Sequence, residues 1–119
     1  EDLSSQWGLD HFGVSTGSAM GDLDGDGDLD LVVNGFEEPI LVYRNDVSTG
    51  NPLRIKLKGR VSNSGGIGAK IVLETNNGFK QMVRYVTGSR GFMSSSEPTV
   101  HFGLGTMDMA EKITIYWPS

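Results

Sequence analysis

The stretch MGDLDGDGDLDLVV, residues 20–33, places an acidic loop directly before an apolar run. Its acidic part, Asp22 to Asp30, holds five aspartates in nine residues. Its apolar part, Leu29 to Val33, is typical of a β-strand, because it is short and rich in leucine and valine. A second apolar run, Ile40 to Arg44, follows the turn-forming residues 34–39. The two runs therefore predict an antiparallel β-hairpin.

The rest of the chain also predicts β-structure. Seventeen glycines separate short apolar runs, and no window has helical periodicity. Five later runs alternate apolar and polar residues, as expected for strands with one buried face: 53–58, 69–74, 79–86, 99–102 and 112–117. The turn Asn76-Asn77-Gly78 predicts a hairpin between the second and third runs, and Ser94–Ser96 predicts a flexible loop. We expect an all-β protein in which the hairpin joins a small antiparallel sandwich or partly open barrel of about five strands.

The charge of the chain changes sign near its middle. Residues 1–51 carry eleven acids and one base, whereas residues 52–119 carry four acids and nine bases. Asn45 to Pro52 has the composition of a linker, so we predict two domains, 1–51 and 52–119, that meet there. The acidic first part argues against a nucleic-acid partner.

Composition excludes several other classes of function. No run approaches the ~20 apolar residues of a membrane span, so we expect none. The absence of cysteine excludes disulfides, thiolate metal sites and thiol catalysis. Any metal ion must therefore be held by oxygen or by the two histidines.

The acidic loop predicts a calcium site. Ca²⁺ prefers six to eight oxygen ligands, and a loop with acids at positions 1, 3 and 5 and glycine at position 6 can curl around one ion. Starting at Asp22, glycine falls at Gly27, whereas a start at Asp24 would put Leu29 at that position. We predict that the ion is held by five residues, the fourth of them through its backbone carbonyl: Asp22, Asp24, Asp26, Asp28 and Asp30.

Other interpretations of this loop fit less well. An EF-hand needs glutamate at position 12, which is Val33 here, and its flanks are helices. Mg²⁺ usually keeps several waters rather than an all-protein shell. An acidic turn without an ion needs only one or two aspartates, not a carboxylate at every odd position.

Two parts of the chain resemble known families. The strings Ala19 to Val33 and Leu41 to Asn45 are similar to an FG-GAP or VCBS repeat, the calcium-bearing blade of integrin-type β-propellers. The second part resembles the ASPIC and UnbV domain, which follows such repeats in the cartilage acidic protein family. Four strings carry this second resemblance: Leu57–Gly59, Gly66–Ile71, Val100–Gly105 and Ile115–Ser119. The resemblance implies that the chain is the C-terminal part of a longer exported protein whose remaining propeller blades are partners of this one.

The functional expectation is a calcium-binding, non-enzymatic binding or adhesion module with a glycan or protein ligand. No nucleophile motif occurs, and His11 and His101 lie ninety positions apart; for His101 we expect a structural hydrogen bond. One alternative is an enzyme acting on polysaccharide through Glu37, Glu38 or Glu97, which would need paired carboxylates. Another is a structural cap, in which the basic second part closes the propeller against the acidic first part.

Overall fold

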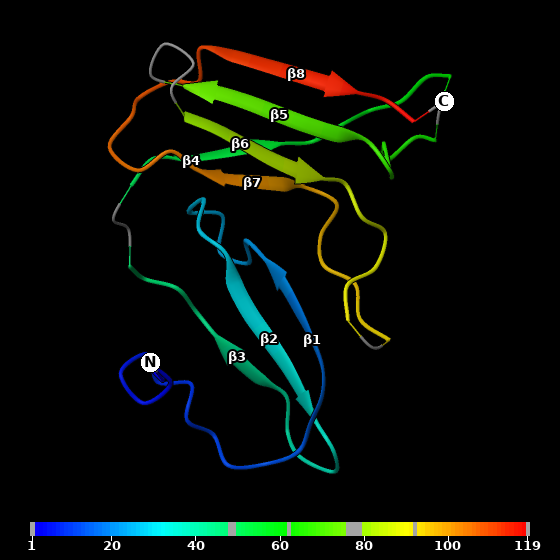
Figure 1. Ribbon diagram of the computed structural model, residues 1–119. Coiled ribbons are helices and arrows are strands. Elements are labelled where there is room, and N and C mark those ends of the chain that lie inside the picture. Colours follow the sequence, from blue (N-terminus) through cyan, green and yellow to red (C-terminus); the bar gives the residue numbers. More distant parts are fainter. Residues whose placement is uncertain (1, 48–49, 62, 76–79, 92, 119) are drawn as a thin grey trace.

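The computed structural model describes residues 2–47, 50–61, 63–75, 80–91 and 93–118. These residues form eight strands and no helix, which confirms the all-β prediction (Figure 1). In chain order the strands are β1 (Ser15–Gly21), β2 (Asp30–Gly35), β3 (Leu41–Tyr43), β4 (Pro52–Ile55), β5 (Lys70–Thr75), β6 (Lys80–Tyr85), β7 (Val100–Gly103) and β8 (Lys112–Tyr116).

The first sheet contains the predicted hairpin and one additional strand. Strands β2 and β3 pair antiparallel, with Val32 opposite Val42, so the hairpin is confirmed. Strand β1 pairs antiparallel along the other side of β2, which gives the order β1-β2-β3. Strand β1 was not predicted from the sequence. Its sequence, STGSAMG, contains one residue that favours strands, Thr16, beside two glycines and small polar residues, and its pairing with β2 overrides this weak propensity.

The five strands predicted after residue 52 form two further sheets. Strand β4 pairs with β7, and β5 lies between β6 and β8, all antiparallel. Over the described residues these sheets do not close into a barrel, and the arrangement is that of a small β-sandwich. The turn predicted at Asn76-Asn77-Gly78 lies outside the described residues, but the strands on either side of it pair as predicted, with Thr75 opposite Lys80.

The hydrophobic core lies within the second part of the chain. Its buried members all come after residue 56: Leu57, Ala69, Ile71, Leu73, Val86, Val100, Phe102 and Leu104. Ile71 and Leu73 lie on the predicted apolar face of β5. Val72, on the opposite face, is also buried, because β5 is the central strand of its sheet. The first sheet contributes no residue to this core; Val42 on β3 is exposed, and so is Phe36 directly after β2.

Residues 94–97 connect the two parts of the molecule along the edge of β1. The N–H of Ser18 donates to Ser94 Oγ at 3.2 Å, and the N–H of Met20 donates to Ser96 Oγ at 3.1 Å. The N–H of Glu97 donates in turn to the Met20 carbonyl at 3.3 Å. The segment predicted as a flexible serine loop is irregular but docked, because its hydroxyls accept from the open edge of the first sheet.

Candidate metal centre and the adjoining pocket

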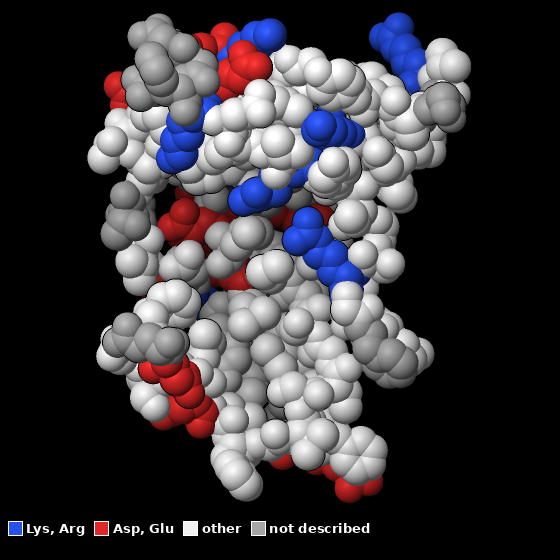
Figure 2. All heavy atoms as spheres, viewed as in Figure 1, with Lys and Arg blue, Asp and Glu red and all other residues white. Residues whose placement is uncertain are grey.

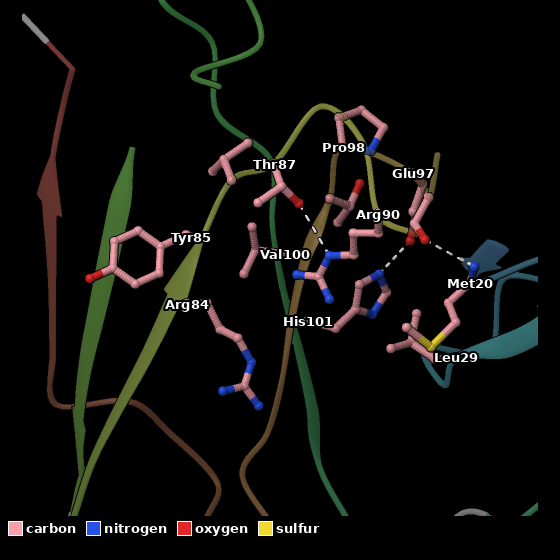
Figure 3. Close-up of a pocket in the computed structure, with 13 residues that line it drawn as sticks. Met20, Leu29, Arg84, Tyr85, Thr87, Arg90, Glu97, Pro98, Val100 and His101 are labelled. Carbon is pink, nitrogen blue, oxygen red and sulfur yellow. Dashed lines mark hydrogen bonds and ion pairs between the residues drawn. The ribbon is translucent and has the colours of Figure 1, made fainter. Parts of the chain in front are cut away.

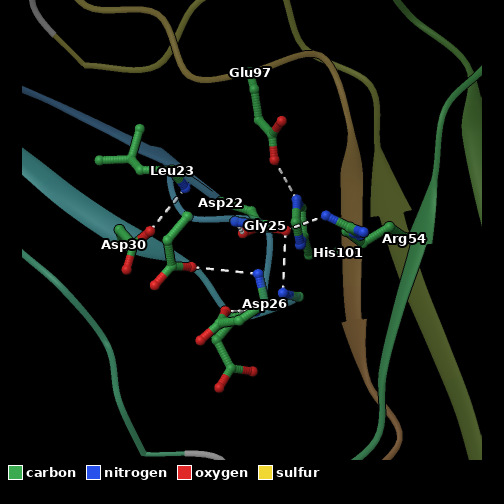
Figure 4. A network of polar contacts seen from close by, with 11 residues as sticks. Asp22, Leu23, Gly25, Asp26, Asp30, Arg54, Glu97 and His101 are labelled. Atoms are coloured by element: carbon green, nitrogen blue, oxygen red, sulfur yellow. Dashed lines mark hydrogen bonds and ion pairs between the residues drawn. The ribbon is translucent and has the colours of Figure 1, made fainter.

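The acidic loop joins β1 to β2 and faces the second part of the molecule (Figure 4). Two glycines allow its tight path, because Gly25 and Gly27 have φ of 84° and 105°, which side chains disfavour. At Gly27 there is also no room for a side chain, since a Cβ there would lie 2.7 Å from Pro52 Cγ. The glycine predicted for the sharp turn is thus required for two separate reasons.

Three of the five predicted ligands are brought together. Asp22, Asp24 and Asp30 each offer a carboxylate oxygen, and these oxygens lie within 4.8 Å of one another. Two oxygens bound to one Ca²⁺ at ~2.3–2.6 Å can be at most about 5.2 Å apart. The spacing of the three oxygens therefore fits a shared calcium ion.

The other two predicted ligands are placed differently. Asp26 is exposed, and its Oδ1 accepts the N–H of Asp28 at 2.9 Å. The side chain of Asp28 is not part of the group of three, which is compatible with the role assigned to its backbone carbonyl. That role stays a prediction.

Asp22 is the most constrained acid of the loop. Its side chain is 2% exposed, and its two oxygens accept the N–H groups of Gly25 at 2.8 Å and Gly27 at 3.1 Å. Its Oδ2 also forms an ion pair with Arg54, which projects from β4 (Figure 4). This ion pair crosses between the two parts of the molecule, and Figure 2 shows acidic atoms recessed there with basic side chains around them.

Asp30 is buried at the start of β2. Its carboxylate accepts the N–H of Asn45 at 2.9 Å and that of Leu23 at 2.8 Å. Both bonds lower the pKa of Asp30, and the bond from Asn45 contributes more than the bond from Leu23. Together they outweigh burial, which acts in the opposite direction. Asp30 therefore stays ionised and ties the loop to the segment after β3.

A pocket adjoins the loop where the first sheet meets β6, β7 and the connection between them (Figure 3). Its volume is about 420 Å³. On one wall the His101 side chain is 11% exposed and its Nε2 contacts Glu97 Oε1, as expected for a structural hydrogen bond. Among the described residues, no group hydrogen-bonds the buried Nδ1 of His101.

Of the glutamates named as catalytic alternatives, Glu37 and Glu38 are adjacent in the chain, and Glu97 lies far from both. Glu38 contacts His11 at 2.9 Å near the Gly35 end of the first sheet, and Glu37 precedes it with φ of 56°. Glu97 lies beside Met20 at the other end. Gly35 pairs with Ser15, and at ~3.3 Å per residue the five steps along β1 from Ser15 to Met20 span about 17 Å. This separation exceeds the ~5–9.5 Å of paired glycosidase carboxylates.

Several residues of these sites were not predicted. Arg54 lies on the polar face of the predicted strand 53–58, but the sequence does not show that it reaches Asp22, thirty-two positions earlier. Arg84 and Arg90 line the pocket, yet the sequence alone identifies them only as basic residues of the second part. Such long-range pairings depend on how the sheets stack, which spacing alone does not reveal.

Fold and site together define a small all-β module with a cluster of three carboxylates suited to a divalent cation. The sequence model of the family described as ASPIC and UnbV matches residues 59–119, and the chain belongs to this family. The chain is also 35% identical over 122 residues to cartilage acidic protein 1 of Mus musculus and of Homo sapiens, and 33% identical over 109 residues to that of Xenopus tropicalis.

These similarities extend beyond the residues that the family model matches. The mouse and human alignments cover 99% of this chain and 18% of the relative, and the Xenopus alignment covers 89% and 16%. The region of similarity therefore includes the acidic first part of the chain. The chain spans less than a fifth of the length of these relatives.

Proposed function

We propose that this chain is a calcium-binding, non-enzymatic binding or adhesion module from the C-terminal part of a larger exported protein. The observation that carries this proposal is the convergence of Asp22, Asp24 and Asp30, whose oxygens lie within 4.8 Å of one another. Close carboxylates repel one another, and a divalent cation held between them would offset that repulsion. Arg54 supplies one positive charge at this cluster, which leaves a net negative site.

We further propose that the first sheet is a blade of the FG-GAP or VCBS type. Support comes from its three antiparallel strands and from the position of the acidic loop between β1 and β2. Propeller blades are four-stranded sheets that pack on neighbouring blades. Exposed apolar side chains in the first part of the chain would supply such packing surfaces: Val14, Phe36, Ile40 and Val42.

An exported location is supported by the strength expected of such a site. Calcium sites of extracellular modules bind with a Kd of ~10⁻⁴–10⁻³ M, so they stay nearly empty at the far lower calcium concentration of the cytosol. The name of the matched relatives, cartilage acidic protein 1, agrees with this location. None of the described residues forms a helix that could span a membrane.

Thermal unfolding in EDTA and in ~1 mM calcium tests the proposal. With a Kd of ~0.1 mM, calcium would add ~1.4 kcal/mol to the free energy of unfolding. For a chain of this size the midpoint should rise by roughly 5 °C. Asp24→Ala should remove most of this rise, because it removes one of the three converging carboxylates.

Asp10→Ala is the matched control, since Asp10 is an exposed aspartate outside the loop. It should keep the full calcium response. Equal midpoints with and without calcium in the unsubstituted chain would contradict the proposal.

The structural-cap alternative has one observation in its favour, the ion pair between Arg54 and Asp22 across the two parts. If capping were the sole role, residues 52–119 alone should fold poorly and expose apolar surface. The core cluster lies entirely within those residues, which favours independent folding of that part. A cooperative melt of residues 52–119 alone would count against the cap.

A further inference from the structure

The pocket beside the acidic loop is lined by two arginines and one carboxylate, so its positive charges outnumber its negative charge. Arg84 lines it from β6, and Arg90 lines it from the connection between β6 and β7 (Figure 3). One acid, Glu97, lines the same pocket, and its Oε1 is taken by His101. The pocket therefore carries a net positive charge in a chain whose net charge is −5.

The two pocket arginines differ from Arg44 and Arg54, which have carboxylate partners. Arg44 is paired with Asp46, and Arg54 with Asp22. Over the described residues, neither Arg84 nor Arg90 has a carboxylate within ion-pair distance.

Uncharged groups hold these two side chains instead. Arg90 Nε donates to Thr87 Oγ1 at 3.1 Å, and Arg84 Nη1 donates to the Val83 carbonyl at 3.1 Å. Arg84 also lies over the Phe102 ring, at 5.8 Å from its centroid. These contacts orient both guanidinium groups and leave their positive charges unmatched. A guanidinium with unmatched charge is suited to bidentate recognition of a carboxylate or sulfate.

The size and lining of the pocket identify the molecule that would carry this anionic group. A volume of about 420 Å³ falls in the ~300–1,000 Å³ range of small-molecule sites. Hydroxyls of Ser96 and Thr99 alternate along its wall with apolar groups of Pro98 and Val100. This mixture suits a sugar ring, which presents hydroxyls at its edge and C–H groups on its faces.

We propose that this pocket binds an acidic saccharide, with Arg84 and Arg90 receiving its carboxylate or sulfate. This proposal deepens the binding function proposed above and rests on it, but it does not require calcium in the loop. An acidic peptide fits less well, because peptides commonly add to an open sheet edge and residues 94–97 already cover the edge of β1.

The test is a titration of the whole chain, followed by backbone amide NMR shifts and calorimetry. The probes are digalacturonate, sulfated galactobiose, neutral galactobiose, tetraglutamate and inorganic sulfate. We expect saturable binding of at least one acidic disaccharide, with shifts centred on the amides of Thr87, Ser96 and Val100. Neutral galactobiose should bind at least roughly tenfold more weakly, since it offers the guanidinium groups no anion.

Charge-removing variants then locate the site. Arg90→Gln should weaken binding of the acidic disaccharide roughly tenfold, and so should Arg84→Gln. The matched control is Arg60→Gln, because Arg60 is exposed and does not line this pocket, and it should bind normally. If Arg84→Gln fails to fold after losing its contact with Phe102, Arg90→Gln alone decides.

Three results would overturn the proposal. The first is that neither acidic disaccharide binds saturably. The second is that both pocket variants leave the binding unchanged. The third is that tetraglutamate or inorganic sulfate binds as tightly as the acidic disaccharide does. Each titration is run in EDTA and in calcium, with a thermal melt of the same samples. A missing melt shift would count against the calcium proposal alone, and missing saccharide binding would count against the pocket alone.

Discussion

Asp30 is a charged residue with almost no solvent exposure, and backbone N–H groups from two different segments hold its carboxylate. These bonds stabilise the ionised form and lower the pKa of Asp30. Because the pKa is lower in the folded state than in the unfolded state, this stabilisation is complete above about pH 4. It is lost as the pH falls through the folded-state value.

Asp30→Asn should therefore change how stability depends on pH. In EDTA at pH 7, we expect it to reduce the free energy of unfolding by about 1–3 kcal/mol, because a buried N–H loses its acceptor. The difference from the unsubstituted chain should shrink below about pH 4. Urea unfolding between pH 2.5 and 7 measures this, with Asp10→Asn as the exposed control. A difference that is constant over that range would contradict the role given to Asp30.

Arg54→Gln should destabilise the chain in a calcium-dependent way. Without metal, the buried carboxylate of Asp22 loses its cation in this variant. We expect the free energy of unfolding to fall by about 1–2 kcal/mol, a modest loss because the Arg54 side chain is partly exposed to solvent. In millimolar calcium the loss should be smaller, since the ion supplies positive charge at the same cluster. Urea unfolding under both conditions checks this. Lys56→Gln, an exposed lysine on the same segment, should have little effect, and an equal loss with and without calcium would refute the link.

At the residue scale, the sequence was most informative where chemistry is concentrated in one loop. Five aspartates in nine residues predicted the cluster, and three of them converge. The contacts that Arg54 and Asn45 make with this loop were not predictable. They depend on the stacking of segments that are distant in the sequence.

The two parts of the molecule are joined along the edge of β1 by a regular pattern of hydrogen bonds. Alternate N–H groups of this strand, those of Ser18 and Met20, donate to the hydroxyls of Ser94 and Ser96. Side-chain oxygens thus take the place that a neighbouring strand would otherwise fill. This covering blocks pairing of β1 with another chain through these groups.

Ser96→Ala should uncover part of this edge. We expect a loss of about 0.5–1.5 kcal/mol in the free energy of unfolding, the usual effect of one hydrogen bond. The amide of Met20 should exchange its hydrogen faster, and the amide of Ser18 should change less. Hydrogen exchange followed by NMR resolves the two amides. With Ser5→Ala, an exposed serine outside this contact, neither rate should change; unchanged exchange at Met20 in Ser96→Ala would contradict the edge contact.

At the element scale, the hairpin and the five later strands were predictable because their apolar alternation is clear. Strand β1 was missed because Gly17, Ser18 and Ala19 carry no β-preference, and its pairing with β2 creates the strand. The pairing of β4 with β7 was also beyond the sequence pattern, since forty-four residues separate the two strands. Alternation identifies strands but does not order them.

Across the whole molecule, stability is distributed unevenly. The buried core belongs to residues after 56, while the first sheet is held by its ladder, by Asp30 and by contacts with the second part. The charge division predicted two regions of different character, and the boundary between residues 51 and 52 stays a prediction. The sandwich was foreseen as a class, but which faces remain exposed depends on packing.

Phe102→Ala should test this distribution. Phe102 is 1% exposed in the core, so we expect a loss of about 3–5 kcal/mol in the free energy of unfolding. The first part has a matched phenylalanine, Phe12, that is 99% exposed. Phe12→Ala should change stability by less than about 0.5 kcal/mol. Chemical denaturation compares the two variants, and similar losses would contradict the placement of the core.

The most direct test of the central claim is calorimetric titration of the metal-free chain with calcium. The convergence of Asp22, Asp24 and Asp30 predicts saturable binding of about one ion with a Kd of ~10⁻⁴–10⁻³ M, and it predicts that Asp24→Ala largely abolishes this binding. A titration without binding heat that also leaves the melting midpoint unmoved, or one that Asp24→Ala leaves unchanged, would contradict the account.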